Sequence, residues 1–223
     1  VFGAGKFARS ILLPNLRKLN NVTFHTLVTK RGMSAGYFKD NLGFTYGETN
    51  ADTVFQNPDI NAVVIATSHS SHADLTKKAL RSGKNVFVEK PLSLTLSDLD
   101  TIATKYTELK EDAPILLVGF NRRFSPLSLK MKTLIEQQAS PISIIATINV
   151  GHIPVDHWTQ DPTIGGGRIK GEACHFIDLI RFLVGKPIVN WSSNLLGDNV
   201  TKDTVTLSFL FEDGSIGTIH YFA

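Results

Sequence analysis

The chain has 223 residues, of which 42% are hydrophobic and 19% charged, which suits one large or two modest globular domains with a buried core. Its formal net charge of +3 is small and comes from interleaved acids and bases, so no nucleic-acid partner is expected. No apolar run is long enough to span a membrane, and the single cysteine excludes an internal disulfide framework and suits a reducing, cytoplasmic compartment.

Both ends of the sequence fall inside expected strands. The chain opens at Val1-Phe2 without a methionine and closes within residues 218–223. We therefore expect a piece of a longer polypeptide, whose localisation signals would lie elsewhere.

A glycine-rich turn follows the first expected strand. Gly3-Ala4-Gly5-Lys6-Phe7-Ala8 is the Gly-x-Gly-x-x-Ala variant of the dinucleotide-binding fingerprint. The first glycine permits a tight turn, the second lets the backbone approach a pyrophosphate, and the alanine keeps helix and strand close. A helix expected over residues 7–19 would point its N-terminal N–H groups at the phosphates.

The second expected strand, residues 22–29, ends on two cations. Enzymes that use NAD place an acid at this point to hold the ribose 2′-hydroxyl. Here the strand end reads Thr29-Lys30-Arg31, whose hydroxyl and cations can pair with a 2′-phosphate. The pattern slightly favours NADP over NAD; the alternative is a set of solvated charges at a strand end.

Helices are expected over residues 34–42 and 52–56, and the continuous apolar run 62–66 predicts a central parallel strand. Thr67-Ser68-His69-Ser70-Ser71-His72 follows, where Ser and Thr suit the N-cap of a helix that runs to about Arg81. His69 and His72 are three residues apart, but no carboxylate or thiol accompanies them, so no metal site is expected.

A charged pair follows the next strand, in Asn85-Val86-Phe87-Val88-Glu89-Lys90-Pro91. Ligands of an open parallel sheet bind beyond the carboxyl ends of its strands. Glu89 and Lys90 therefore stand where a cofactor and a substrate would meet, although a surface pair before a turn proline is a common alternative. A helix over 93–108 and a strand over 115–119 complete a doubly wound α/β domain, residues 1–120.

Residues 121–223 predict an α+β domain with an open, mainly antiparallel sheet. The expected elements are a helix over 127–137, a strand over 141–150, a polar loop over 151–167, a helix ending at Val184, and strands over 189–196, 204–211 and 215–222. Asp213-Gly214 marks a hairpin between the last two strands. A long loop is usually functional or disordered. An open sheet face commonly packs on a partner subunit, so we expect a homo-oligomer.

These motifs together resemble the glucose–fructose oxidoreductase / inositol dehydrogenase family (Gfo/Idh/MocA). The matching residues are Gly3-Ala4-Gly5, Ala66-Thr67 with His72, Glu89-Lys90-Pro91, Asn121-Arg122-Arg123-Phe124, Gly165-Gly166-Gly167 and His175-Phe176-Ile177-Asp178. They occur in the family's order and span nearly the whole chain. Residues 168–175 are most similar to members fused behind a zinc-type alcohol dehydrogenase module, which would here be a module ahead of Val1.

The resemblance implies a Rossmann domain that binds NAD or NADP, and a second domain that carries substrate contacts and oligomer interfaces. It implies hydride transfer between the nicotinamide and a carbon-bound hydroxyl, usually of a sugar, cyclitol or related small polyol. The family's lysine corresponds to Lys90, its histidine to His175, and Asn121 resembles the position near the nicotinamide. Many members have an Asp four residues before the histidine; here Gly171 stands there, followed by Glu172, which leaves part of the proton relay open.

The residues expected at the cofactor are Gly3, Gly5, Lys6, Phe7, Thr29, Lys30, Arg31, Thr67, Ser68, His72, Glu89, Lys90 and Asn121. Oxidation of an alcohol removes a proton from oxygen as hydride leaves carbon. A neutral imidazole suits the role of general base, so His175 is expected to take the proton, although a structural histidine is the alternative. The Lys90 ammonium would favour the developing alkoxide, and Glu172, three residues before His175, would orient the imidazole.

The substrate-binding candidates are Arg122, Trp158, Asp161 and His175. Arg122 and Arg123 could hold an anionic or polyol substrate; the alternative, slightly favoured, is that one of them is a structural ion-pair partner. Trp158 either packs over the cofactor or anchors the long loop. Asp178 is expected to brace its helix, and Cys174 to be a small buried hydrophobe.

Two other functions fit the same scaffold. The first is an isomerase or lyase that retains its cofactor through a transient oxidation. The second is a non-catalytic sensor that binds the dinucleotide, which Gly171 favours and the presence of Lys90 and His175 opposes.

Overall fold

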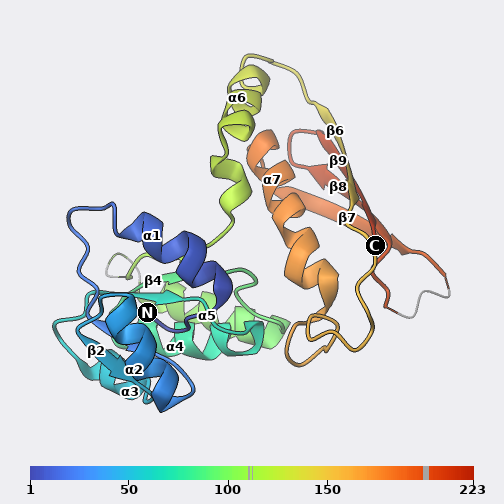
Figure 1. Cartoon of the computed structure of the whole chain (residues 1–223). Coiled ribbons are helices and arrows are strands. Elements are labelled where there is room, and N and C mark those ends of the chain that lie inside the picture. Colours follow the sequence, from blue (N-terminus) through green and yellow to red (C-terminus); the bar gives the residue numbers. More distant parts are fainter. Residues whose placement is uncertain (110, 112, 198–200) are drawn as a thin grey trace. The chain divides into compact units, whose positions relative to one another are not determined.

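The computed structural model describes residues 1–109, 111, 113–197 and 201–223, and it divides into two compact units, Val1–Gly119 and Phe120–Ala223 (Figure 1). The division lies one residue before the boundary expected from the sequence. The first unit carries parallel strands, and the second carries a mixed sheet with helices on one face.

The first unit is a Rossmann-like arrangement of short parallel strands and helices. Its helices are η1 (Ala8–Leu12), α1 (Leu13–Leu16), α2 (Gly32–Asn41), α3 (Asp52–Gln56), η2 (His69–Ser71), α4 (His72–Arg81) and α5 (Leu96–Leu109). Its strands are β1 (Thr26–Val28), β2 (Tyr46–Glu48), β3 (Ala62–Ile65), β4 (Asn85–Val88) and β5 (Leu116–Val118). β1 pairs with β2, and β3, β4 and β5 form a second ladder, all in parallel register.

Apolar side chains of β3 and β4 form the centre of this unit. Val63, Ile65, Val86 and Val88 are buried and pack against apolar residues of α3, α4 and α5. A second cluster joins Leu13, Leu27 and Phe44. Fully covered parallel strands read as continuous apolar runs, which is why residues 62–66 and 85–88 were recognisable in the sequence.

The structure differs from the sequence expectations at three places in this unit. Of the strand expected over 22–29, only Thr26–Val28 forms strand β1. Strand β2 was not expected at all. In β2, a Cβ on Gly47 would lie 2.6 Å from the carbonyl oxygen of Ala35, so glycine lets α2 pack closely on the strand. The helix expected over 7–19 is present from residue 6 to residue 16, but it ends three residues early and has a π-helical turn over Ala8–Leu12, where Pro14 has no N–H to donate to the turn before it.

The second unit is a four-stranded sheet with two helices on one face (Figure 1). Its elements are η4 (Asn121–Phe124), α6 (Pro126–Ile135), β6 (Ser143–Asn149), η5 (Ile169–Ala173), α7 (Cys174–Val184), β7 (Ile188–Leu195), β8 (Val205–Phe211) and β9 (Ile216–Phe222). The strand order is β6-β9-β8-β7, with β6 and β9 parallel and the other two pairs antiparallel. This confirms the mainly antiparallel sheet.

Alternation along the strands decides which face of this sheet is buried. Leu207, Phe209, Ile219 and Tyr221 are buried and pack with Ile180 of α7. The intervening residues lie on the opposite face, where no described element of this unit covers them. The exposed apolar residues of that face are Ile145, Leu210, Ile216 and Phe222.

Candidate nucleotide and substrate sites

The glycine-rich turn has the geometry that a dinucleotide fingerprint requires. Gly3 has φ +94°, and a Cβ at that residue would lie 2.5 Å from the carbonyl oxygen of Ala66, so only glycine fits. A Cβ at Gly5 would meet nothing within 4 Å, and Gly5, Lys6 and Phe7 are exposed. The turn therefore presents open backbone at the start of a helix, which fits the pyrophosphate of NAD or NADP.

Thr29-Lys30-Arg31 follows β1, whose last residue, Val28, forms a bridge with Phe2 just before the glycine-rich turn. Lys30 and Arg31 are exposed. The Thr29 hydroxyl donates to the carbonyl of Arg31 at 2.9 Å, which folds the strand end into a turn. Glu48 pairs with Val28 on the neighbouring strand, so one acid lies on the next strand of the sheet.

His72 is a buried link between two turns. Its ring is fully buried, with Nδ1 2.8 Å from the carbonyl oxygen of Pro91 and Nε2 3.1 Å from that of Thr67. Burial lowers the pKa of His72 below its ordinary value of 6.5, although the carbonyls act in the opposite direction. His72 therefore joins the turn after β3 to the turn after β4, and its effect on a cofactor would pass through those turns.

The hydroxyls after β3 do not cap the helices there. Ser68 and Ser71 stand at the N-cap positions of η2 and α4, but neither side chain caps its helix. Instead the hydroxyls of Thr67 and Ser71 lie 2.6 Å apart, and Ser71 donates to the carbonyl of Ser68 at 2.8 Å. The expected side-chain caps were therefore wrong, because these hydroxyls bond within their own turn.

Glu89 and Lys90 follow β4 directly, at the carboxyl end of the sheet. The Glu89 N–H donates to the carbonyl of Ile65 at 2.9 Å, so this residue still belongs to the strand ladder. A Cβ on Gly119 would lie 3.0 Å from Oε1 of Glu89, so glycine leaves room for this carboxylate. Burial raises the pKa of Glu89 above its ordinary value of 4.5. Lys90 is half-buried, and its peptide bond to Pro91 is cis.

In the second unit, the turn η4 is bound to α7. Arg123 makes a two-point ion pair with Asp178, in which Nε donates to Oδ2 at 2.9 Å and Nη2 donates to Oδ1. The guanidinium of Arg122 lies 4.3 Å from the ring centroid of Phe176. Asp178 thus braces its helix as expected, and Arg123 is the structural member of the arginine pair.

His175 lies in the first turn of α7, beside this brace. Its ring meets that of Phe120 edge to face, with centroids 6.2 Å apart, and its Nδ1 is buried. Asn121, expected at the cofactor, is exposed at the start of η4. Cys174, expected to be a small buried hydrophobe, is only partly buried at the start of α7.

Glu172 belongs to a cluster that the sequence did not reveal. Its Oε2 accepts from Nη2 of buried Arg168 at 3.0 Å and from the Tyr221 hydroxyl at 2.5 Å. Arg168 also donates to the carbonyl of Gly151 at 2.6 Å. Burial, then Glu172, raises the pKa of Tyr221 above its ordinary value of 10.0. These bonds tie η5, β9 and the start of the long loop together; an orienting role toward His175 stays a prediction.

The long loop from Gly151 to Gly167 is folded on itself. Oδ1 of Asp161 accepts from the N–H and the hydroxyl of Thr163, both at 2.7 Å, and these bonds lower the pKa of Asp161. A Cβ on Gly165 would lie 2.4 Å from Cα of Thr159, so glycine permits this close approach. Trp158 is 46% exposed. The structure thus gives Asp161 a role in the turn, while substrate contacts of Asp161, Trp158 and Arg122 stay predictions.

In the part of the chain that the structure describes, no group of three or more His, Cys, Asp or Glu side chains is arranged to hold a metal ion. Within the same residues, no helix combines the length and the apolar character needed to cross a membrane.

Residues 1–119 match the family described as "Oxidoreductase family, NAD-binding Rossmann fold" (GFO/IDH/MocA), and residues 129–223 match the GFO/IDH/MocA C-terminal domain. The chain is 26% identical over 234 residues to a myo-inositol 2-dehydrogenase of Thermotoga maritima, covering 98% of this chain and 66% of that protein. It is 30% identical over 226 residues to Oxidoreductase P35 of Formosa agariphila, covering 96% of this chain and 68% of that protein.

Solved structures agree with these sequence matches. The crystal structure of a probable dehydrogenase from Thermotoga maritima superposes with a TM-score of 0.82 at 25% identity, covering 100% of this chain and 68% of that one. The chain thus spans about two thirds of the length of these relatives. It belongs to the GFO/IDH/MocA family of oxidoreductases, with the family's NAD-binding Rossmann domain followed by its C-terminal domain.

Proposed function

We propose that this chain is the major part of an NAD(P)-dependent oxidoreductase that transfers hydride between the nicotinamide and a carbon-bound hydroxyl of a sugar, cyclitol or related small polyol. The observation that carries the proposal is the Gly3–Gly5 turn, whose backbone is accessible to a ligand at the start of a helix. The turn lies in a chain that matches an NAD-binding family. Relatives named as inositol 2-dehydrogenases and a levoglucosan dehydrogenase support the substrate class.

The cofactor end of the site is assigned to the first unit. The backbone of Gly5, Lys6 and Phe7 would hold the pyrophosphate at the helix start. The exposed Lys30 and Arg31 would pair with a 2′-phosphate, which gives NADP a slight preference. A relative named as an NAD(+)-dependent scyllo-inositol 2-dehydrogenase shows that NAD serves within the family.

The chemical step is assigned to one side chain from each unit. The bound nicotinamide supplies the carbon that accepts or returns the hydride. His175 would take the hydroxyl proton, and the Lys90 ammonium would stabilise the negative charge that develops on the same oxygen. Glu89, Thr67 and His72 support the backbone turn that carries Lys90.

Single substitutions in the full-length protein test these roles. Lys90→Ala and His175→Ala should each lower kcat by roughly a hundredfold or more, the usual effect of losing a positioned acid or base. Lys130→Ala on exposed α6 is a control that should retain activity. Near-normal turnover of both active-site variants, with cofactor binding intact, would rule out this mechanism.

A binding-only function remains the second candidate because of Gly171. This residue is buried and supplies no carboxylate at the position where many members carry Asp. A dinucleotide sensor would bind the cofactor, measured by titration, and yield no absorbance change at the reduced-nicotinamide wavelength with any sugar, sugar acid or cyclitol. A retained-cofactor isomerase or lyase would convert substrate with no net change in cofactor redox state.

We also propose that the open sheet face contacts a second copy of the chain. Exposed Ile145, Leu210, Ile216 and Phe222 give it apolar side chains, and the paired residues Ser208 and Thr218 lie among them on the same face. Light scattering of Ile145→Glu and Leu210→Glu variants should show a smaller particle than the parent protein. An unchanged mass of both variants would refute this interface.

A further inference from the structure

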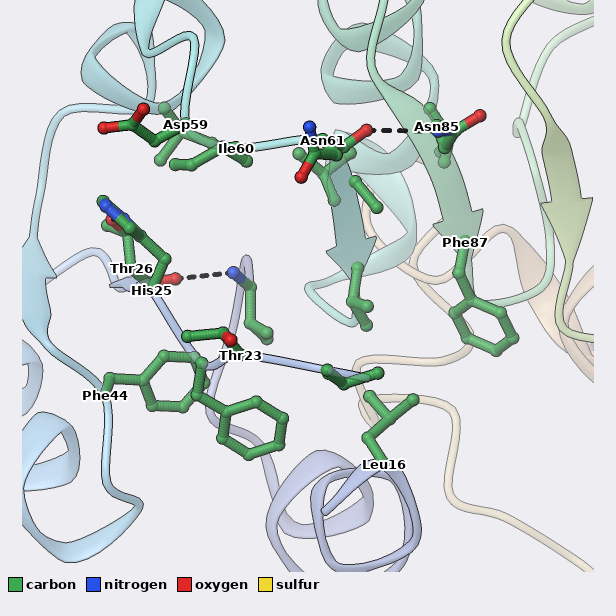
Figure 2. A pocket seen from close by; sticks show the side chains of 18 of the residues that line it. Leu16, Thr23, His25, Thr26, Phe44, Asp59, Ile60, Asn61, Asn85 and Phe87 are labelled. Carbon is green, nitrogen blue, oxygen red and sulfur yellow. Dashed lines mark hydrogen bonds between the residues drawn. The ribbon is translucent and has the colours of Figure 1, made fainter. Parts of the chain in front are cut away.

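The interiors of the two units differ in the charged groups that they bury. The cavity between β1 and β3 of the first unit, about 700 Å³, is lined mainly by apolar residues, and Asp59 at its border is exposed (Figure 2). In the second unit, Arg168 and Asp203 are each 2% exposed, and they are the most deeply buried Lys, Arg, Asp or Glu residues in the described part of the chain. A buried charge is costly unless it is paired and hydrogen-bonded, so the partners of these two residues indicate their role.

Arg168 fixes the beginning of the long loop, residues 151–167. Its Nη1 donates to the carbonyl of Gly151 at 2.6 Å, while Nε and Nη2 both donate to Oε2 of Glu172. Burial lowers the pKa of Arg168, but its bond to Glu172 and nearby charges, including that of Asp203, outweigh this effect and raise it. The guanidinium therefore stays charged, and a charged donor holds the Gly151 carbonyl strongly.

Asp203 fixes a second point of the same loop. Its Oδ2 accepts from Nε2 of Gln160 at 2.5 Å, a bond between a carboxylate and an amide. Asp203 lies two residues before β8, whose alternate side chains pack in the core of this unit, so the bond joins the loop to the sheet. Because the charge of Asp203 also acts on Arg168, the two anchors of the loop belong to one buried cluster.

Residues 152–159, between the two anchors, combine a closely packed backbone with exposed side chains. The Thr159 carbonyl accepts from the Gly167 N–H at 2.8 Å, and a Cβ on Gly165 would lie 2.5 Å from the Trp158 carbonyl oxygen. Trp158 is nevertheless 46% exposed. Its backbone is thus fixed by the base of the loop, while its side chain is accessible to a ligand.

An accessible indole on a fixed backbone suits the ring of a sugar or cyclitol. Trp offers a large, flat apolar surface, on which the C–H groups of one ring face can pack while the ring hydroxyls stay available to polar groups. Binding then loses little conformational entropy, because the position of the indole is set beforehand.

We infer that Asp203 is a positioning residue for the substrate: through Gln160 it holds the loop so that Trp158 packs against the sugar or cyclitol ring. The inference rests on the proposed function, because it needs a substrate of that class. Asp203 acts through the loop, so its loss should weaken substrate binding and leave the chemical step nearly unchanged.

A pair of substitutions tests the link between Asp203 and the loop. Gln160→Glu sets two carboxylates against each other and should release the loop, whereas Gln160→Glu combined with Asp203→Asn restores one donor and one acceptor at the same total charge. Hydrogen exchange, read by mass spectrometry on peptides that cover residues 157–160, should quicken about tenfold in the single variant and return to within about twofold of the parent in the double variant. Gln137→Glu, the same change at an exposed position of this unit, is the control and should alter nothing.

Kinetics of the same variants in the full-length protein test the contact with substrate. D-glucose, D-glucuronate and myo-inositol serve as the sugar, sugar acid and cyclitol probes. Gln160→Glu should raise KM for the probe that is turned over about tenfold and leave kcat within about threefold, and the double variant should recover the parent KM. Trp158→Ala should raise KM by a similar factor.

The outcomes separate this inference from the proposed function. Unchanged exchange in Gln160→Glu, or no recovery in the double variant, would overturn the role of Asp203. Faster exchange with an unchanged KM would overturn the substrate contact of Trp158. If the parent turned over none of the three probes, the proposed function and the substrate contact would fail together, while the exchange data would still decide whether Asp203 holds the loop.

Discussion

Removal of the Asp178 carboxylate should weaken the contact between α7 and the η4 turn by a predictable amount. The Asp178 side chain is 8% exposed and that of Arg123 28% exposed, and two hydrogen bonds join them. Breaking a buried pair by removing one partner costs about 3–5 kcal/mol. Because the guanidinium keeps access to water and lies near the ring of Phe182, we expect Asp178→Ala to cost about 2–3 kcal/mol, or roughly 5–10 °C in Tm.

Tryptophan fluorescence isolates this effect, because the chain's two tryptophans, Trp158 and Trp191, both lie in the second unit. Denaturant unfolding of Asp178→Ala, Arg123→Ala and the double variant forms a double-mutant cycle, with exposed Asp156→Ala as the control. The reasoning predicts a coupling energy of about 1.5 kcal/mol or more. Additive single effects, or a loss no larger than that of Asp156→Ala, would refute it.

Four further predictions concern other parts of the molecule. Gly3→Ala should destabilise the protein by at least about 2 kcal/mol, because of its positive φ and the clash with Ala66, whereas Gly5→Ala should fold normally and lose dinucleotide affinity in a fluorescence titration. Replacing Lys30 and Arg31 together by Ala should raise KM for NADP about tenfold or more and leave KM for NAD within twofold; equal changes would contradict the assignment. Tyr221→Phe should cost about 1–3 kcal/mol by removing the hydrogen bond that the buried hydroxyl donates to the Glu172 carboxylate, as measured by urea unfolding. The free energy of unfolding of the 223-residue chain should fall as pH falls from 8 to 5: the amine pKa is about 5 in the folded chain and 8.0 when unfolded, so the unfolded chain binds more protons in this range. The full difference is about 4 kcal/mol for three pKa units, and an acetylated Val1 should lack it.

The sequence predicted those parts of the fold whose physical signal is local. Apolar runs revealed β3 and β4, and the glycine spacing revealed the turn at Gly3–Gly5, because each depends on neighbours along the chain. The strand β2 escaped because it is three residues long and half-exposed, and Gly47 breaks its pattern. The spacing of Arg168 and Glu172 at i, i+4 was a usable signal for their ion pair, but nothing local connects them to Tyr221, 49 residues beyond Glu172.

The buried links around the candidate residues differ in chemistry between the two units, and this difference has a consequence for pH. In the first unit, the turn that carries Lys90 is held by a buried imidazole between two carbonyls; burial lowers the pKa of His72, whereas its bonds to the carbonyls act in the opposite direction. In the second, the elements around His175 are held by Arg123–Asp178 and Arg168–Glu172, pairs that keep their guanidinium charge at any physiological pH. A loss of activity near neutral pH would therefore point to a histidine and not to the arginine links, which do not titrate there.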